Sequence, residues 1–222
     1  MVDLKDRGRI TLRVTEIFQS IQGESSYAGW PCAFIRLTGC PLRCTYCDTA
    51  YAFEGGETYT IDGILSLIDP FKCRLVQVTG GEPLAQKGTI PLLQVLADRG
   101  YKVLLETGGS EDIRPVDPRV VIIYDIKTPG SGEVERNRWE NLAHLKNEDE
   151  IKCVIGSRKD YEWSRDLIRD KDLEDRHIVH FSPVFGAVTP RELTGWILED
   201  GLRVRLNLQL HKFIWDPETR GV

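Results

Sequence analysis

Short apolar segments rich in β-branched residues recur along this chain and alternate with segments that carry helix start and end signals. Repeated β-α units of this kind indicate a mainly parallel sheet whose strands are joined by right-handed crossovers. An apolar segment at residues 13–20 predicts one extra strand before the series begins. The series itself is predicted to contain strands over residues 32–37, 74–78, 102–105, 120–124, 151–155, 178–181 and 203–210.

Helices are predicted between several of these strands. Thr89 and Ser157 are residue types that cap the first turn of a helix. Thr189 and Glu192 have the spacing of a capping box, and Gly201 follows the end of that segment. The predicted helices cover residues 60–68, 90–99, 133–146, 158–169 and 190–200.

The number of predicted strands decides the fold class. Six or seven parallel strands are fewer than a closed eight-fold barrel needs, and 222 residues are few for one. We therefore expect an α/β fold: a partial, open (β/α) barrel of about six parallel strands with an N-terminal extra strand. An ordinary doubly wound sheet is the alternative. No internal repeat or linker is found, so residues 1–222 are expected to form a single domain.

Composition and charge narrow the class of protein. Lys and Arg number 29 against 34 Asp and Glu, which gives a net charge of −5, and 41% of the residues are hydrophobic. This mixed, mildly acidic chain argues against broad binding to nucleic acid or anionic membranes. No apolar run approaches the ~18–20 residues of a membrane span, and the first residues lack the apolar stretch of a secretory signal. We expect a cytoplasmic globular protein.

Unusual residues cluster where five predicted strands end. Parallel α/β folds bind ligands at the carboxyl ends of their strands. Taken singly, paired glycines or Ser-Pro would only indicate turns. Their shared position predicts a binding site along one rim of the sheet. The segments concerned are residues 38–40, 79–83, 106–109, 125–127 and 182–186.

The six cysteines do not resemble a disulfide framework. Cys40, Cys44 and Cys47 lie within eight residues, whereas those at 32, 73 and 153 lie far apart beside apolar residues, as buried free thiols do. A Cys-x3-Cys-x2-Cys loop lets three thiolates converge on one metal centre. No nearby Cys or His supplies a fourth ligand, because the histidines lie at 144, 177, 180 and 211.

Three interpretations of the cysteine loop remain open at this point. One is a [4Fe-4S] cluster with three irons held by protein and one left open for a ligand, with Tyr46 shielding it. The second is a zinc site closed by a distant histidine. The third is a redox disulfide.

Two motifs resemble those of the radical S-adenosylmethionine (SAM) enzymes. The first is the cysteine loop with Tyr46, and the second is Thr79-Gly-Gly-Glu-Pro83 at the end of the next strand. A narrower resemblance, to the 7-carboxy-7-deazaguanine synthase family, covers nearly the whole chain. It rests on residues 18–24, 34–37, 47–49, 125–127, 149–152 and 209–217.

The resemblance implies a small homodimeric radical SAM lyase of queuosine and deazapurine biosynthesis. Its implied cofactors are a [4Fe-4S] cluster, SAM and Mg²⁺, with electrons from a one-electron donor such as flavodoxin. Its implied reaction takes 6-carboxy-5,6,7,8-tetrahydropterin to 7-carboxy-7-deazaguanine with loss of ammonia. A 5′-deoxyadenosyl radical would take hydrogen from the pterin C6, the ring would contract, and SAM would be regenerated.

The resemblance also implies roles for individual residues, none of them catalytic beyond the ligands of cluster and cofactor. Cys40, Cys44 and Cys47 would hold the cluster, and Thr49 would bind Mg²⁺. The implied pterin-binding residues are Ile21, Gln22, Gly23, Arg36, Thr79 and Pro217. The implied SAM-binding residues are Tyr46, Asp48, Gly81, Asp125, Ile126, Lys127, Ser182, Pro183, Val184 and Phe185.

Simpler interpretations stand beside these roles. Arg36 could form a surface ion pair, and Thr49 could be a helix N-cap. The Asp125-Ile-Lys127 segment departs from the Ser-x-Lys form seen elsewhere in the family. For the whole chain, the alternatives are a glycyl-radical enzyme activase, which is also a radical SAM protein, and a zinc-binding scaffold without enzymatic activity.

Overall fold

A single nine-stranded sheet organises the computed structural model, which describes residues 8–222. The strand order is β3-β1-β2-β4-β5-β6-β7-β8-β9. Strands β2 and β4 to β9 run parallel, while β1 pairs antiparallel with both β2 and β3. The strands are β1 (Thr11–Ile21), β2 (Pro31–Leu37), β3 (Glu57–Thr60), β4 (Leu75–Gly80), β5 (Lys102–Thr107), β6 (Val121–Ile126), β7 (Glu150–Ile155), β8 (Ile178–Pro183) and β9 (Arg205–Leu206).

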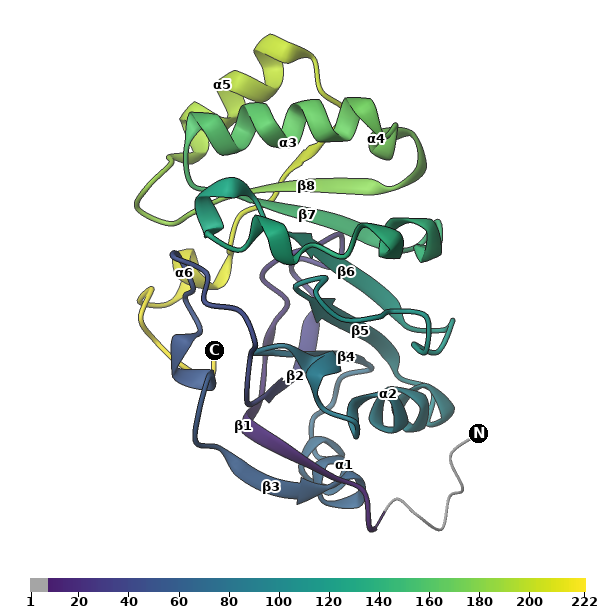
Figure 1. The fold of residues 1–222 in the computed structure, drawn as a ribbon. Helices are drawn as coiled ribbons and strands as arrows, with labels where there is room; N and C mark the ends of the chain where they lie inside the picture. Colours follow the sequence, from purple (N-terminus) through teal and green to yellow (C-terminus); the bar gives the residue numbers. More distant parts are fainter. Residues whose placement is uncertain (1–7) are drawn as a thin grey trace.

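All the longer helices cover one face of this sheet. The helices are α1 (Ile61–Ile68), α2 (Thr89–Asp98), α3 (Arg158–Asp170), α4 (Leu173–Arg176), α5 (Pro190–Asp200) and α6 (His211–Ile214). Figure 1 shows α1, α2, α3 and α5 along the outer side of the curved sheet, with α6 on the other side. A doubly wound sheet would carry helices on both faces. The partial, open barrel is therefore the better description, with β1 as the predicted extra strand.

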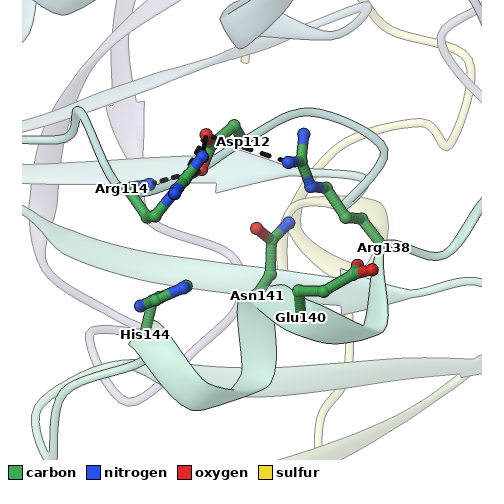
Figure 2. A pocket seen from close by; sticks show the side chains of 6 residues that line it. All are labelled: Asp112, Arg114, Arg138, Glu140, Asn141 and His144. Atoms are coloured by element: carbon green, nitrogen blue, oxygen red, sulfur yellow. Dashed lines mark hydrogen bonds and ion pairs between the residues drawn. The ribbon is translucent and has the colours of Figure 1, made fainter.

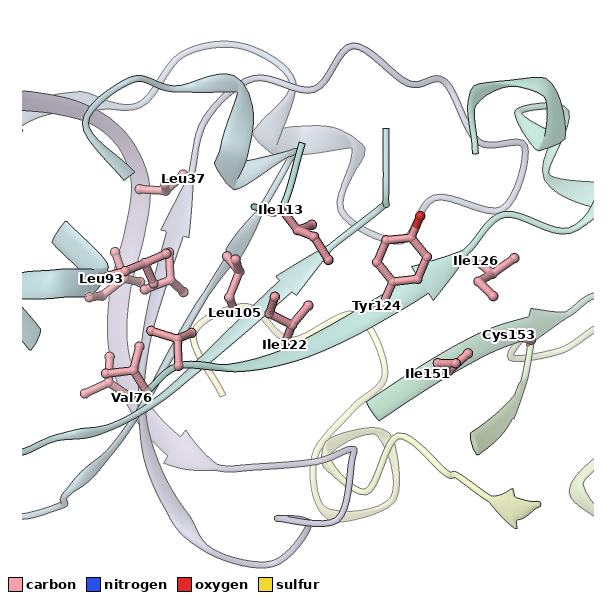
Figure 3. Packing of buried hydrophobic residues seen from close by; sticks show 14 of the residues in the cluster. Leu37, Val76, Leu93, Leu105, Ile113, Ile122, Tyr124, Ile126, Ile151 and Cys153 are labelled. Atoms are coloured by element: carbon pink, nitrogen blue, oxygen red, sulfur yellow. The ribbon is translucent and has the colours of Figure 1, made fainter. Parts of the chain in front are cut away.

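Alternate residues of each strand build the main core between sheet and helices. Val76, Leu105, Ile122, Tyr124 and Ile151 point to the helix face and pack in one buried cluster (Figure 3). A second, smaller cluster on the opposite face consists of strand residues such as Phe34, Leu104 and Ile123. Because side chains alternate along a strand, the strand residues outside the main core point to this opposite face, which lines the hollow of the half-barrel.

Helix capping follows the sequence in most places. The side chains of Thr60 and Ser157 accept hydrogen bonds from the backbone N–H groups of Gly63 and Asp160. Thr189 and Glu192 form the predicted capping box, and Gly201 ends α5 in the left-handed conformation at φ 60°. Within residues 8–222, each helix is too short or too polar to cross a bilayer.

The predicted cap at Thr89 is wrong by one residue. Gly88 is the N-cap of α2, and Thr89 lies inside the first turn, where its hydroxyl donates to the Pro83 carbonyl. A Cβ on Gly88 would lie 2.8 Å from the Thr11 carbonyl oxygen. Strand β1 therefore leaves no room for a capping side chain at this position.

The polar helix predicted over residues 133–146 is also wrong. The segment forms two 3₁₀ turns, η5 (Val134–Arg136) and η6 (Trp139–His144). Between them the Asn137 side chain accepts from the Lys127 N–H at 2.9 Å and donates to its carbonyl at 2.8 Å. This side-chain pairing fixes the segment to the end of β6 and interrupts a continuous helix.

The last predicted strand is shorter than residues 203–210. Only Arg205 and Leu206 pair with β8, and the Asn207 N–H makes the last backbone hydrogen bond to that strand, at 2.9 Å from the Phe181 carbonyl. The Asn207 side chain donates to Ser182 Oγ at 2.9 Å and accepts from the Ser25 N–H at 3.0 Å. Strand β3 and helices α4 and α6 were not predicted.

Candidate active site

The three clustered cysteines lie on the loop that follows β2. Cys40, Cys44 and Cys47 are free and half-buried. Burial raises the pKa of each thiol, and the nearby Lys127 ammonium acts in the opposite direction. This positive charge favours thiolates, the form that binds iron. Within residues 8–222, no three His, Cys, Asp or Glu side chains converge as ligands of a single metal ion.

Backbone contacts fix the cysteine loop against the segment that follows β6. The Thr45 N–H donates to the Ser131 carbonyl at 2.9 Å, and the Thr45 hydroxyl donates to the Gly130 carbonyl at 2.7 Å. The Arg43 N–H donates to Glu133 at 2.7 Å. The loop is thus shaped by residues about 85–90 positions away in the sequence.

The glycines of the second motif fit against this loop. A Cβ on Gly81 would lie 2.0 Å from the Gly39 carbonyl oxygen and 3.0 Å from the Cys40 Cβ. The Glu82 N–H donates to the same Gly39 carbonyl at 2.8 Å. The close approach that requires glycine here is made by the cysteine loop itself. A contact between Gly81 and SAM stays a prediction.

Gly81→Ala is expected to displace the cysteine loop and to lower iron binding, because the added methyl group would overlap the Gly39 backbone. We expect a loss of about 1–3 kcal/mol in the free energy of unfolding, the usual cost of overpacking. Urea unfolding and iron content after anaerobic reconstitution measure both effects. Gly195→Ala is the control, since a Cβ there meets nothing within 4 Å. Normal iron binding by the Gly81→Ala protein would contradict this role of Gly81 in shaping the cysteine loop.

Glu82 was not assigned a role from the sequence, and the structure gives it one. Its buried carboxylate accepts from the Leu84 N–H at 3.0 Å, the Thr107 hydroxyl at 2.8 Å and the Gly108 N–H at 2.8 Å. Burial raises the pKa of Glu82, and these hydrogen bonds oppose the rise. The side chain ties the ends of β4 and β5 together at the rim.

Two predicted SAM-binding residues form an ion pair at the end of β6. Asp125 Oδ2 lies 2.8 Å from Lys127 Nζ, and both side chains are almost fully buried. Burial would lower the pKa of Lys127, but Asp125 and the nearby Cys44 hold it above its usual range. Asp125 Oδ1 is buried without a hydrogen-bond partner in residues 8–222. An unpaired buried carboxylate oxygen is a suitable acceptor for a ligand hydroxyl.

Tyr46 extends from the cysteine loop to the same place. Its hydroxyl lies 3.4 Å from Thr128 Oγ1. A Cβ on Gly156 would lie 3.5 Å from Val184 Cγ2 and 3.8 Å from Tyr46 Cδ1. Burial raises the pKa of Tyr46. Tyr46 and Val184 thus flank Gly156, and shielding of the cluster by Tyr46 stays a prediction.

The other predicted SAM contacts differ in their surroundings. The Ile126 side chain is buried in the core on the helix face, so only its backbone is available to a ligand. Ser182 is buried and accepts from Asn207, Pro183 ends β8, and Phe185 is 52% exposed.

A polar network lines the hollow face below the rim. Glu106 accepts from Gln77 Nε2 at 2.9 Å and from the Thr79 hydroxyl at 3.1 Å. Lys152, whose side chain is 8% exposed, forms ion pairs through Nζ with Glu106 and with Glu24 Oε2, the latter at 3.0 Å. The predicted pterin-binding residue Thr79 is therefore part of a connected set from β4, β5 and β7.

The segment after β1 crosses this hollow. The Gln22 side chain is buried, donates to Gln77 and accepts from the Glu24 N–H at 3.2 Å. Ile21 is the last residue of β1, and the Gly23 carbonyl accepts from the Leu210 N–H at 3.0 Å. The predicted pterin segment thus lies against the polar network.

Arg36 forms an ion pair, as its simpler interpretation predicted, but the pair is largely buried and not at the surface. Its Nε lies 2.6 Å from Glu16 Oε1, and both side chains are less than 20% exposed. A register shift between Val14 and Glu16 in β1 places this carboxylate beside Arg36. Within residues 8–222, the two terminal nitrogens of Arg36 have no hydrogen-bond partner. They are available to a ligand carboxylate.

The residues after β9 close the open side of the half-barrel. Asp48 accepts from Gln209 Nε2 at 2.9 Å and lies 3.2 Å from Lys212 Nζ. Burial would raise the pKa of Asp48, but Lys212 and Gln209 outweigh it and lower the pKa. Lys212 Nζ also lies 5.4 Å from the centre of the Phe185 ring.

Thr49 and Pro217 lie near this closure. The Thr49 hydroxyl donates to Asp48 Oδ1 at 2.9 Å. Thr49 occupies the N-cap position of the 3₁₀ turn η2 (Ala50–Ala52), as its simpler interpretation predicted, but its side chain makes no capping hydrogen bond. Pro217 is half-buried beyond α6. Their predicted contacts with Mg²⁺ and substrate stay predictions.

A separate pocket of about 240 Å³ contains none of these residues. Figure 2 shows Asp112 paired with Arg114 and facing Arg138, with side chains of η6 opposite. Its lining consists of Asp112, Arg114, Arg138, Glu140, Asn141 and His144. Both arginines of this pocket already pair with Asp112, so the pocket is not part of the candidate site.

Comparison with known proteins shows which family this chain belongs to. The model of the radical SAM superfamily matches residues 34–120. A protein named 7-carboxy-7-deazaguanine synthase, from Chlorobaculum tepidum, is 51% identical over 95% of this chain and 97% of its own. Another of that name, from Koribacter versatilis, is 46% identical over 95% of this chain and 100% of its own. The chain belongs to the 7-carboxy-7-deazaguanine synthase family.

A solved structure supports the same fold. The crystal structure of QueE from Escherichia coli has a TM-score of 0.78 and 24% sequence identity, and it covers 94% of this chain and 98% of that one. At this identity the likeness concerns the fold alone. It agrees with the partial barrel expected for a 7-carboxy-7-deazaguanine synthase family member.

Sequence reasoning missed two members of the polar network in this 7-carboxy-7-deazaguanine synthase family chain. Gln77 and Lys152 received no role, whereas Glu106 was expected among the polar groups at the strand ends, without a definite role. A signal was present, because each is a polar residue at an alternating position of an otherwise apolar strand. Such a pattern marks the face of a sheet that is turned away from the core.

Proposed function

We propose that this chain is a 7-carboxy-7-deazaguanine synthase, a radical SAM lyase of queuosine and deazapurine biosynthesis. The substrate would be 6-carboxy-5,6,7,8-tetrahydropterin, and the products 7-carboxy-7-deazaguanine and ammonia. The observation that supports this most is the 51% identity, over 95% of the chain, to a relative of that name. The donor set at the rim of the sheet is consistent with it.

The residues present fit the implied cofactors. Cys40, Cys44 and Cys47 would each hold one iron of a [4Fe-4S] cluster, on a loop fixed by contacts to residues 130–133. When bound, the cluster and SAM supply a carbon-centred radical that removes hydrogen from the substrate. The unpaired oxygen of Asp125 would accept from a hydroxyl of SAM, and Tyr46 would keep water from the site.

The substrate would lie on the hollow face, between the rim and the segment after β1. The free end of the Arg36 guanidinium would bind the pterin carboxylate, since a planar fork suits that anion. Thr79 and the Gln22–Gly23 backbone would orient the ring system. Thr49 would complete the coordination of Mg²⁺ together with water and substrate oxygens.

The assembly and setting of the protein follow from the same proposal. The chain would act in the cytoplasm as a homodimer of single-domain subunits. Electrons would come from a one-electron donor such as flavodoxin. These statements rest on the family resemblance, and sedimentation or size-exclusion measurements test the dimer directly.

Anaerobic turnover tests the proposed function. The reconstituted protein, supplied with SAM, a reductant and 6-carboxytetrahydropterin, is expected to release 7-carboxy-7-deazaguanine and to leave SAM unconsumed. A glycyl-radical activase would form no deazaguanine, and a zinc scaffold would stay colourless after reconstitution with iron and sulfide. Either outcome would refute the proposal.

Thr49→Ala is expected to lower the apparent affinity for Mg²⁺ by about tenfold or more, the scale of losses when groups around a metal site are removed. The physical reason is the loss of the hydroxyl oxygen that would bind the ion beside Asp48. Turnover measured over a range of Mg²⁺ concentrations gives the apparent affinity. Thr49→Ser keeps the hydroxyl and should restore it, whereas equal Mg²⁺ affinities for all three proteins would contradict the assignment.

A further inference from the structure

Arg220, beyond the segment that resembles the family, lies over an aromatic ring at the site. Its guanidinium carbon is 4.0 Å from the centre of the Tyr51 ring. Figure 1 shows the end of the chain beside the short turn that contains Tyr51. Within residues 8–222, the Arg220 nitrogens make no hydrogen bond or ion pair, so their donors are free. A stacked arginine keeps its donors directed outward in a plane.

Tyr51 connects Arg220 to the carboxylate-binding residue proposed above. The Tyr51 hydroxyl donates to Glu16 Oε1 at 2.8 Å, the same oxygen that Arg36 Nε contacts at 2.6 Å. The Arg36 guanidinium carbon lies 6.0 Å from the centre of the Tyr51 ring. Both guanidinium groups are therefore within 6.0 Å of one ring centre.

The charges of this cluster do not balance. Arg36 and Arg220 carry two positive charges, and Glu16 supplies one negative charge. The neighbouring Asp48 is already paired with Lys212. One positive charge is thus left over beside the Tyr51 ring, and each of the two guanidinium groups keeps free donors. A single carboxylate would neutralise it.

We propose that Arg220 is a second guanidinium ligand for the carboxylate of the substrate, acting together with Arg36. This inference rests on the proposed function and deepens it. Glu16 holds Arg36 through Nε and leaves its terminal nitrogens free, while Tyr51 supports both arginines. The pair selects a pterin that carries a carboxylate over one that lacks it, because an unpaired positive pair gains nothing from the unsubstituted ring.

Two ligands that differ only in the carboxylate provide the test. Equilibrium dialysis of 6-carboxypterin and of unsubstituted pterin, against the cluster-loaded protein with SAM, gives a dissociation constant for each. Arg220→Ala is expected to weaken 6-carboxypterin binding about tenfold, the scale of one lost charge-assisted hydrogen bond, and to change pterin binding less than about twofold. Arg220→Lys keeps the charge without the fork and should give an intermediate loss for 6-carboxypterin.

Arg191→Ala is the matched control, because Arg191 is an exposed arginine of α5 on the helix side of the sheet. It should leave both dissociation constants unchanged. An equal loss for both ligands in Arg220→Ala would overturn the inference, since it would indicate a role in ordering the tail. Unchanged binding of 6-carboxypterin would overturn it as well.

Turnover by the unsubstituted protein separates this inference from the proposed function. If product forms and Arg220→Ala binds 6-carboxypterin normally, the inference alone fails. If no product forms and the carboxylate-selective loss is still measured, the proposed reaction fails and the assignment of Arg220 stands.

Discussion

Cys44→Ala is expected to abolish formation of 7-carboxy-7-deazaguanine while leaving the sheet folded. Three thiolates each hold one iron of a [4Fe-4S] cluster of this type, so the loss of one removes a corner that nothing else on the loop replaces. The thiol is half-buried, and the loop around it is fixed by Arg43 and Thr45. Iron content, visible absorbance and product yield should all fall to background, with an unchanged circular dichroism spectrum.

Cys73→Ala provides the matched control for this prediction. Cys73 is also a half-buried free thiol, but it lies outside the cysteine loop. That variant should bind iron and form product like the unsubstituted protein. Product formation by Cys44→Ala at the normal rate would refute the cluster assignment.

Lys152→Met is expected to lower the free energy of unfolding by about 3–5 kcal/mol, the usual effect of removing one partner of a buried ion pair. Lys152 Nζ is the cation between Glu24 and Glu106, and only 8% of its side chain is exposed. Methionine fills a similar volume but leaves these carboxylates without a counter-charge. Urea unfolding measures the change.

The pH dependence of this effect follows from the two pKa shifts. Burial would lower the pKa of Lys152, but Glu106 and Glu24 raise it well above its usual value. Burial would raise the pKa of Glu106, but Lys152 lowers it. The carboxylate's contribution is present above its unfolded pKa of about 4.3 and is lost as the pH falls through the folded pKa. The lysine's contribution is present below its unfolded pKa of about 10.4 and is lost as the pH rises through the folded pKa.

The difference between Lys152→Met and the unsubstituted protein should therefore be largest near neutral pH. Lys102→Met is the control, because Lys102 begins the next-but-one strand, is exposed, and lies 5.7 Å from the centre of the Tyr27 ring. It should cost about 1 kcal/mol or less. A pH-independent loss in Lys152→Met would indicate lost packing in place of lost charge.

The sequence predicted those parts of the fold that depend on local chemistry. Apolar runs gave the strands β2 and β4 to β8, and the capping box at Thr189 gave the start of α5. The wrong predictions concern segments whose conformation depends on a residue far away in the sequence. Strand β1 removes the space for a cap at Gly88, and Asn137 pairs with Lys127 to interrupt the expected helix. Neither partner is visible in a local pattern.

In the candidate site, too, local features could be predicted and contacts between distant residues could not. The cysteine spacing is local, so the donors of the loop could be read from the sequence. The contacts of Gly81, Arg36 and Lys152 depend on how strands are ordered across the sheet. Glu16 reaches Arg36 only because a register shift in β1 turns it to that side. Such a shift has no signature in the alternation of polar and apolar residues.

The hydrogen bonds that join Gly23 and Asp48 to residues 209–212 link the beginning of the chain to a segment made much later. The hollow face is therefore covered only once the segment after β9 has docked on the residues that follow β1 and β2.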